Sequence, residues 1–331
     1  MKHAEGGQES SLYLHFPCFD GVVSAVIAAE FLERRLGWTI SRYVPVEYDR
    51  APSWRTEPIG SRSAVVDFLY HPQAFFWADH HATSFQEPRD RAALDGASNR
   101  YLYYDATCPS CSILLWRNLG ASLGDSPRLA EMVSWADKID SAAYASVNEA
   151  IFGGSPAMEI SFSLAIDKSE RYCNFLVHAL REQTLGEVAR LPEVREPAQS
   201  FKDKIGIGLD AVKRDLHIGG AIVRCDVEEP SGGIISRYSP YYFAPDARYS
   251  VMLVRSAGGA KVTAMRNPWL DFESVEIGKL MEQFGGGGHR RVGSVQLKGG
   301  RVNEAAQIQE QIAAQIENLD AIDAAAEASP A

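Results

Sequence analysis

Short apolar segments alternate with helical patterns through the first part of the chain, and this alternation constrains the fold more than any other feature. Residues 11–16 (SLYLHF) read as a strand. They precede residues 22–36, whose apolar side chains recur at helical spacing and stop at Gly37. Further strand patterns cover 39–46, 63–68 and 74–78. Apolar strands that alternate with helices predict an α/β fold with an N-terminal doubly wound, mostly parallel sheet.

The length of the chain predicts more than one domain, because 331 residues exceed what one ordinary core accommodates. We expect a first domain over 1–190, a linker and connecting helix over 191–217, a second, smaller α/β domain over 218–301, and a helical tail over 302–331. The linker is placed at 191–198 (LPEVREPA), where two prolines and mixed charges occur together.

The composition is that of a globular protein, with 46% hydrophobic residues. No apolar run approaches the roughly 20 residues of a membrane span, and the polar N-terminus lacks a signal-peptide pattern. Five scattered cysteines indicate a reducing compartment, so we expect the cytoplasm. The net charge of −10 disfavours binding of long nucleic acids. Residues 218–301 hold eleven Lys and Arg against eight Asp and Glu, which fits a substrate-holding module or random surface charge.

Polar residues stand at or just after the ends of the predicted strands. His15 and Asp20 follow the first strand, Asp67 follows the strand at 63–68, and Asp79 follows the strand at 74–78. In open α/β sheets, ligands bind beyond the carboxyl ends of the strands. The sequence therefore predicts a functional site at this edge of the sheet.

The triplet Asp79-His80-His81 is the sharpest local signal, because three such groups need partners if they are buried. Imidazole with carboxylates suits manganese, whereas carboxylates alone favour magnesium. A solvated loop with two surface histidines is the alternative. Two metal ions about 3.5–4 Å apart could activate water and stabilise oxygens during attack on phosphorus. The remaining candidate ligands are His15, Asp20, Asp67 and Asp137.

Four successive glycines at 285–288 precede His289. Backbone N–H groups without side chains can close around an anion, and His289 can add a donor. A flexible linker is the alternative, which the apolar strand pattern at 292–297 disfavours. Arg266, at the end of a predicted strand, is either a bidentate phosphate ligand or an ordinary surface residue.

Three weaker signals carry no functional prediction. Cys108-Pro-Ser-Cys111 has the spacing of half a zinc or redox site, but small residues packing at a helix start explain it without a second cysteine pair. Gly206-Ile-Gly208 is a fragment of a glycine fingerprint. The tyrosines at 238–249 could stack on bases, although an aromatic core is the default interpretation.

Taken in order, these motifs resemble the DHH phosphoesterase family with its DHH-associated C-terminal domain. The resemblance spans nearly the whole chain. Members include oligoribonucleases (nanoRNases), single-strand exonucleases, cyclic-dinucleotide phosphodiesterases, and relatives that act on polyphosphate or pyrophosphate. The motifs that carry it are His15, Asp20-Gly21, Asp67, Asp79-His80-His81, Asp137 and Gly286-Gly-Gly-His289.

The resemblance also implies roles for individual residues. Asp79 supports the site, His81 faces the scissile phosphate, and Arg266 contacts the substrate. Asp67 is implied as the bridge between two metal ions. The metal ligands are implied to be His15, Asp20, Asp67, His80 and Asp137. The residues that grip the substrate's terminal phosphate are implied to be Gly286, Gly287, Gly288 and His289.

One departure from the family concerns Cys18, which stands where the first motif usually has the first of two aspartates. The spacing from His15 is also one residue short. Cys18 could bind a softer ion as thiolate, or its metal site could be weak or empty. A cysteine between Pro17 and Phe19 is more often buried than reactive, which favours the non-ligating interpretation. Val292 also replaces a usually small residue in the last motif.

The predicted function is hydrolysis of phosphodiester bonds in short oligonucleotides or small nucleotides, in a cleft between the two domains. The expected cofactor is one or two Mn²⁺ ions, with Mg²⁺ or Co²⁺ as alternatives. A phosphoanhydride hydrolase acting on polyphosphate or pyrophosphate, and a catalytically weakened nucleotide-binding module, are the competing predictions. The expected partner is a short single-stranded oligonucleotide or a small phosphorylated nucleotide, with no membrane; a homodimer is among the assemblies that the sequence allows.

Overall fold

A computed structural model describes residues 10–92, 94 and 101–327 of the chain. The first nine residues, which carry the expectation about a signal peptide, and 328–331, the end of the expected tail, lie outside the described residues. The chain forms two compact units. The first contains the described residues up to Ala143 together with Gly154–Ser200, and the second contains Tyr144–Gly153 and the residues from Phe201 onward.

The first unit is built on a five-stranded sheet in the order β2-β1-β3-β4-β5, and every strand pairs in parallel with its neighbours. This confirms the predicted α/β class and the parallel sheet. The strands are β1 (Ser10–His15), β2 (Ile40–Val46), β3 (Ser63–Val66), β4 (Phe76–Asp79) and β5 (Tyr101–Tyr104).

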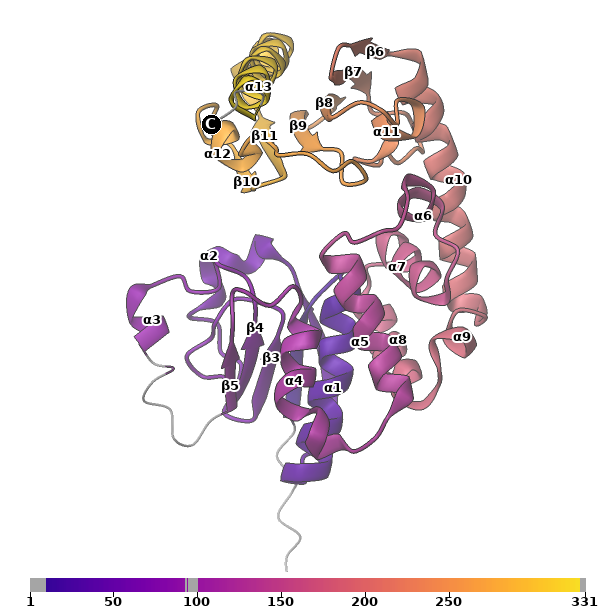
Figure 1. Ribbon diagram of the computed structural model, residues 1–331. Coiled ribbons are helices and arrows are strands. Elements are labelled where there is room, and N and C mark those ends of the chain that lie inside the picture. Colours follow the sequence, from indigo (N-terminus) through magenta and orange to yellow (C-terminus); the bar gives the residue numbers. More distant parts are fainter. Residues whose placement is uncertain (1–9, 93, 95–100, 328–331) are drawn as a thin grey trace, which may run out of the picture. The chain divides into compact units, whose positions relative to one another are not determined.

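Successive strand residues point to opposite faces of the sheet, so each face needs its own cover. Leu12 and Leu14 pack in a core with α1 (Phe19–Leu36), α4 (Cys111–Leu123) and α5 (Pro127–Asp140). Tyr13 and Trp77 pack on the other face, in a cluster that includes Trp54 of α2 (Ala51–Trp54). Figure 1 shows α1 and α4 on one side of the sheet and α2 and α3 (Pro88–Ala92) on the other. The sheet is therefore doubly wound, as predicted.

Helix α1 begins after Cys18 and ends where the sequence predicts. Gly37 adopts φ 64°, and its N–H bonds to the carbonyl of Glu33, which closes the last turn. The remaining helices of the unit are α7 (Pro156–Ile166), α8 (Glu170–Glu182) and α9 (Leu185–Val188), followed by the first turns of α10 (Pro192–Arg214).

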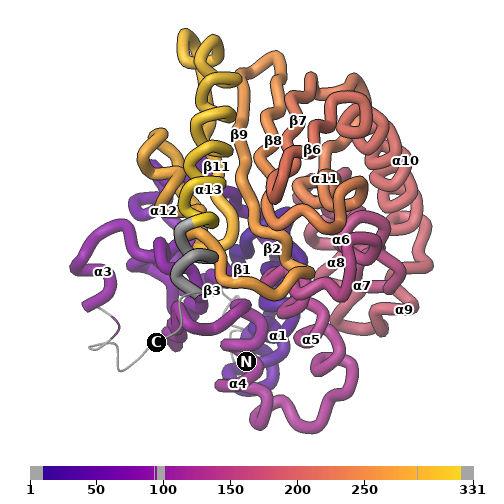
Figure 2. The backbone as a smooth tube through the Cα atoms, turned by 45° about the horizontal axis from the view of Figure 1, so that its top comes forward, coloured from indigo at the N-terminus to yellow at the C-terminus, as the bar shows by residue number. Residues whose placement is uncertain are grey.

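The second unit contains a six-stranded mixed sheet in the order β10-β11-β9-β8-β7-β6. Helix α13 (Ala305–Glu327) runs along it in Figure 2, and its residues Ala305, Ile308 and Ile312 enter the core of this unit. The expected helical tail is thus an integral layer of the second unit. The strands are β6 (Leu216–Gly219), β7 (Ile222–Glu228), β8 (Tyr249–Ser256), β9 (Gly259–Arg266), β10 (Gly287–His289) and β11 (Val292–Leu297).

Two short helices, α11 (Ser239–Phe243) and α12 (Ile277–Glu282), lie between strands of the second unit, and a 3-10 turn at Gly299–Glu304 leads from β11 into α13. Helix α6 (Val147–Phe152) joins this unit although we expected 144–153 in the first domain. The ring of Phe152 in α6 packs on Tyr242. Just before α6, Tyr144 packs on Tyr238, and its carbonyl accepts a hydrogen bond from the Trp269 side chain.

The expected linker at 191–198 is not a loop, because α10 is continuous through it. Pro192 occupies the first helical position, where a proline costs no hydrogen bond. Pro197 lies inside the helix. No described helix combines the length and apolar character that crossing a membrane requires.

Candidate metal centre

The predicted residues meet at one edge of the parallel sheet. His15 ends β1, Asp67 follows β3 and Asp79 ends β4. With the strand order β2-β1-β3-β4-β5, the winding of the sheet reverses between β1 and β3. Open α/β sheets bind ligands at such a switch point, because the loops there diverge to opposite faces. The topology therefore places the candidate site between His15 and Asp67.

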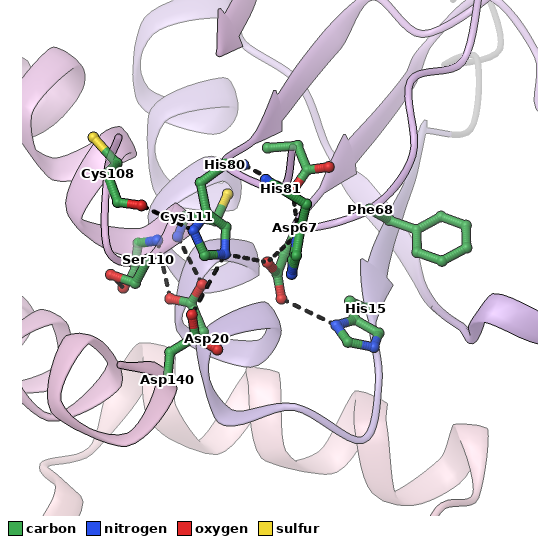
Figure 3. A network of polar contacts seen from close by, with 12 residues as sticks. His15, Asp20, Asp67, Phe68, His80, His81, Cys108, Ser110, Cys111 and Asp140 are labelled. Atoms are coloured by element: carbon green, nitrogen blue, oxygen red, sulfur yellow. Dashed lines mark hydrogen bonds and ion pairs between the residues drawn. The ribbon is translucent and has the colours of Figure 1, made fainter. Parts of the chain in front are cut away.

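Asp67 has an unusual backbone conformation for a residue that is not glycine, with φ 57°. Its N–H bonds to the Ala78 carbonyl at 2.8 Å. The next two carbonyls, of Phe68 and Leu69, accept hydrogen bonds from the ring N–H groups of Trp77 and Trp54, each at 2.9 Å. Such conformations persist where the surroundings fix them, and they concentrate at functional sites. The side chain is 1% exposed and points into the cluster (Figure 3).

The two oxygens of Asp67 face two different histidines. Oδ2 lies 3.3 Å from His15 Nδ1, and Oδ1 lies 3.6 Å from His80 Nε2 (Figure 3). His81 Nδ1 is 3.9 Å from the same Oδ1. Asp67 is thus positioned between two groups of potential ligands, and its role as a bridge between metal ions stays a prediction.

The orientation of His80 leaves a lone pair in the cluster. His80 Nδ1 lies 3.1 Å from the Cys108 carbonyl oxygen, which can only accept, so Nδ1 carries the proton in neutral imidazole. Nε2 then faces Asp67 Oδ1 at 3.6 Å and Asp140 Oδ2 at 3.4 Å with no hydrogen to share. Asp67 Oδ1 and His80 Nε2 are both buried without a hydrogen-bond partner in the described structure. A cation between facing acceptors of this kind would satisfy both, so the donor set fits a divalent metal.

Asp20, in the first turn of α1, is fixed by the start of α4. Its Oδ2 accepts from the Cys111 N–H at 2.7 Å and its Oδ1 accepts from the Ser112 N–H at 3.0 Å. Among the described residues, Asp20, His80 and Asp140 offer ligand atoms within 4.8 Å of one another. The cysteine spacing of the Cys108–Cys111 segment predicted no function. The backbone of this segment in fact orients both His80 and Asp20, a role that side-chain spacing does not reveal.

Asp140, three residues after the predicted ligand Asp137, is the carboxylate that approaches His80 in this cluster. Asp137 accepts a hydrogen bond from Ser110 Oγ at 3.1 Å and belongs to none of the ligand groups found among the described residues. Asp140 ends α5 one turn later, and its Oδ2 lies 3.4 Å from His80 Nε2. Both aspartates occur in the same helical stretch, three residues apart, so they share a helix face and only the packing separates them.

Asp79 is positioned to orient the histidines. It is fully buried, and its Oδ1 accepts from the His80 N–H and from His81 Nδ1, both at 2.8 Å. Its Oδ2 accepts from Ser84 Oγ at 2.5 Å. With Nδ1 of His81 engaged in this way, the other ring nitrogen, Nε2, is available to a substrate.

The carboxylates of the site accumulate negative charge in a buried place. Burial first, and then the charges of Asp20, Asp79 and Asp140, raise the pKa of Asp67 well above its ordinary value. Burial and the charge of Asp20 likewise raise the pKa of Asp140 to about 7. A bound cation would favour the ionised carboxylates and reverse these shifts.

The two flanking histidines respond in opposite directions. Burial, followed by the charge of His81, lowers the pKa of His15 to about 4, which keeps it neutral and able to bind a metal. Burial alone would lower the pKa of His81, but the hydrogen bond and charge of Asp79 outweigh it and raise that pKa. Of these two histidines, His81 is the one that more readily carries a proton.

An aromatic wall adjoins the histidines. Tyr48, in the 3-10 turn Tyr48–Arg50 after β2, has its ring centroid 5.1 Å from that of His15 and 6.2 Å from that of His81. Phe68 packs against Tyr48 at 5.1 Å. Tyr48 is 41% exposed although it is a large apolar ring. No sequence pattern pointed to Tyr48 as a site residue.

The predicted phosphate-binding residues belong to the second unit. Arg266 is only 5% exposed, and its two terminal nitrogens donate to the carbonyls of Asn267 at 3.0 Å and Phe272 at 2.8 Å. Its guanidinium also stacks 4.3 Å from the Phe272 ring. The arginine expected to contact substrate is thus engaged by its own domain.

The glycine run leads into a hairpin. Gly287 pairs with Ser294, Gly288 with Gly293 and His289 with Val292. A Cβ at Gly288, which has φ 156°, would lie 2.3 Å from the Val292 carbonyl oxygen, so close backbone packing requires glycine there. At Gly287 a Cβ would meet nothing within 4 Å. Backbone packing explains part of this run, whereas Gly287 has no such constraint.

A doubly wound parallel sheet with a histidine–carboxylate cluster at its switch point, in one chain with a second mixed sheet, defines the class of protein: the chain has the fold of the DHH-domain proteins. This confirms the fold that the sequence resemblance implied. No family model matches the chain, and no curated protein matches it in sequence.

The solved structures that share this fold cover most of the chain at low sequence identity. The pGpG-specific phosphodiesterase PggH from Vibrio cholerae matches with a TM-score of 0.72 and 19% identity, covering 94% of this chain and 99% of that one. A DHH domain described as a member of a family of ribosomal proteins matches with a TM-score of 0.59 and 14% identity, covering 94% of this chain and 87% of that one. RecJ from Thermus thermophilus, in complex with Mn²⁺, matches with a TM-score of 0.55 and 14% identity, covering 94% of this chain and 52% of that one.

Proposed function

We propose that this chain is a divalent-metal-dependent phosphodiesterase that hydrolyses short oligonucleotides or small nucleotides. The observation that carries the proposal is the pair of buried, unpartnered acceptors, Asp67 Oδ1 and His80 Nε2, which face each other at 3.6 Å. A divalent cation bound between the two atoms would satisfy both acceptors. The activity of the Vibrio cholerae protein, a pGpG-specific phosphodiesterase, agrees with this class of substrate.

The residues of the site divide the work of hydrolysis. The ligands would be His15, Asp20, Asp67, His80 and Asp140, which present imidazole and carboxylate donors. Bound divalent ions would supply positive charge for the phosphoryl oxygens and would activate water for attack on phosphorus. Asp79 holds His81 so that Nε2 is directed to the substrate, where it donates a hydrogen bond or a proton to an oxygen of the scissile phosphate.

The exposed ring of Tyr48 favours a nucleotide over an inorganic phosphoanhydride. Nucleobases stack on aromatic side chains whatever their identity, whereas pyrophosphate and polyphosphate have no planar group to stack. Tyr48 lies beside both His15 and His81, so a base placed on it would bring its phosphate towards the ligands. Phe68 supports the ring from behind at 5.1 Å.

The test is a substrate panel with purified protein and Mn²⁺: a dinucleotide, a cyclic dinucleotide, pyrophosphate and polyphosphate. We expect release of mononucleotides from the dinucleotide, dependence on Mn²⁺ or Co²⁺, and complete loss of activity with chelator. Hydrolysis that persists in excess chelator would contradict the metal mechanism. Preferred cleavage of pyrophosphate or polyphosphate would replace the nucleotide by a phosphoanhydride, and binding of the dinucleotide without cleavage would indicate a nucleotide-binding module.

We also infer a cytoplasmic location for the enzyme. All five cysteines are free, and four of them are buried within the two units. An extracellular protein of this kind would more often use cysteines in disulfides. Fractionation of cells that express the full chain checks the location, and recovery with a secreted fraction would contradict it.

A further inference from the structure

Cys18 does not belong to the hydrophobic core of the first unit, although a cysteine between Pro17 and Phe19 is expected to be buried. Its neighbours Phe16 and Phe19 are core residues, as are Cys111 and Cys173, but Cys18 is not among them. It is the N-cap residue of α1, with extended backbone. The residue is partly exposed at the head of the helix, on the side of the metal centre.

The sulfur of Cys18 belongs to a second ligand group of the site. His15, Cys18 and Asp67 each offer one ligand atom, and these atoms lie within 4.8 Å of one another. They come from the end of β1, the cap of α1 and the residue after β3, three elements that meet at the switch point of the sheet. Within this group, Asp67 Oδ2 lies 3.3 Å from His15 Nδ1. The other oxygen, Asp67 Oδ1, is buried without a hydrogen-bond partner and faces His80.

The two groups on either side of Asp67 differ in chemistry. One offers imidazole, sulfur and carboxylate from His15, Cys18 and Asp67, and the other offers carboxylate, imidazole and carboxylate from Asp20, His80 and Asp140. Thiolate ligands select softer divalent ions such as Zn²⁺, whereas carboxylates suit Mn²⁺ and Mg²⁺. Identical ions in both groups would leave one of them with a poorly matched donor set.

We propose that Cys18 is a metal ligand and that the His15–Cys18–Asp67 group binds a thiophilic divalent ion, in the class of Zn²⁺ or Co²⁺. The Asp20–His80–Asp140 group then takes Mn²⁺ or Mg²⁺. When the sulfur–metal bond forms, the S–H bond breaks and its proton passes to solvent. The inference rests on the metal dependence proposed above and adds the identity of the ions.

Cobalt is the probe, because a thiolate bound to Co²⁺ gives a sulfur-to-metal charge-transfer absorption in the near ultraviolet that oxygen and nitrogen ligands do not give. The full chain is stripped with chelator and titrated with Co²⁺. We expect the band to saturate at one equivalent, to persist in Cys173→Ala and to be absent from Cys18→Ser. Zn²⁺ should remove the band by displacing cobalt, and Mg²⁺ should not.

Zinc affinity gives a second measurement on the same proteins. Cys18→Ser should bind Zn²⁺ at least about 100-fold more weakly, the upper range for loss of a mere supporting partner of a metal site. Cys18→Asp should lack the band yet still bind two Mn²⁺ ions, which shows that the variant is folded and that the position faces the metal. Cobalt binding by the wild type without the band, or a band that survives in Cys18→Ser, would overturn the inference.

These outcomes separate the inference from the proposed function. Hydrolysis that depends on Mn²⁺ in a protein without the cobalt band would support the proposed phosphodiesterase activity and contradict Cys18 as a ligand. A cobalt band in a protein that cleaves no member of the substrate panel would support Cys18 as a thiolate ligand and contradict the proposed phosphodiesterase activity.

Discussion

At the scale of single residues, Asp137 and Asp140 show how packing decides between two chemically equivalent side chains. Both lie in the last turns of α5, but Asp137 accepts from Ser110 whereas Asp140 approaches His80 at 3.4 Å. The Ser110 bond is one that an amide oxygen can also accept. The two positions can therefore be tested by the same substitution with opposite expectations.

We expect Asp140→Asn to weaken Mn²⁺ binding by more than about tenfold and to reduce hydrolysis, because it removes a charged donor from the Asp20–His80–Asp140 group. Asp137→Asn is the matched control and should change either quantity by less than about twofold, because the amide preserves the bond to Ser110. Calorimetric titration with Mn²⁺ and initial rates measure both. A larger loss in Asp137→Asn than in Asp140→Asn would restore the assignment made from the sequence.

Tyr48 provides a second residue-scale prediction. Tyr48→Ala should raise the Michaelis constant for a dinucleotide by about 5–150-fold, the equivalent of the ~1–3 kcal/mol that stacking of one base contributes. Tyr48→Phe keeps the ring and should stay close to the wild type. Any residual cleavage of pyrophosphate should be unaffected by either change. Equal effects of Ala and Phe would indicate that the hydroxyl, and not the aromatic face, contacts the substrate.

At the scale of elements, Gly206 and Gly208 of α10 look alike in the sequence but differ in burial and packing. Gly206 is exposed, and a Cβ there would meet nothing within 4 Å. Gly208 is buried, and its Cβ would lie 1.9 Å from the carbonyl oxygen of Ile234. The loop at Ile234 also donates its N–H to the Lys204 carbonyl, so the chain passes directly over this turn of the helix.

Alanine should therefore have opposite effects at these two positions. Gly206→Ala should stabilise the chain by about 0.5–1 kcal/mol, because alanine loses less conformational freedom in a helix. Gly208→Ala should destabilise it by about 1–3 kcal/mol, because the loop at Ile234 must move. Urea unfolding followed by circular dichroism measures both. A neutral or stabilising Gly208→Ala would show that the loop is not packed on α10 in solution.

At the scale of the whole molecule, the candidate metal ligands and the glycine hairpin predicted to bind phosphate belong to different units. The ligand groups among the described residues all lie in the first unit, and the glycine hairpin with His289 lies in the second. The family resemblance implies that the hairpin grips the substrate's terminal phosphate. Metal content and substrate affinity should therefore respond to different substitutions.

His289→Ala should raise the Michaelis constant or lower the turnover of the dinucleotide while the content of bound metal stays at the wild-type level. The reason is that its hairpin belongs to the unit without the ligand groups. Metal analysis of the purified variant, together with steady-state kinetics, gives both quantities. Loss of bound metal in His289→Ala would place this residue among the ligands, and unchanged kinetics would remove it from substrate recognition.

The sequence by itself determined the parallel sheet of the first unit and the strand ends that carry His15, Asp67 and Asp79. It could do so because apolar periodicity and the polar residues that follow each strand are local properties of the chain. The tertiary structure alone decided that Asp140 approaches His80 and that Cys18 lies beside His15 and Asp67, outside the hydrophobic core. These outcomes depend on contacts between residues far apart in sequence, such as the Cys108 carbonyl that turns His80, and local patterns do not encode such contacts.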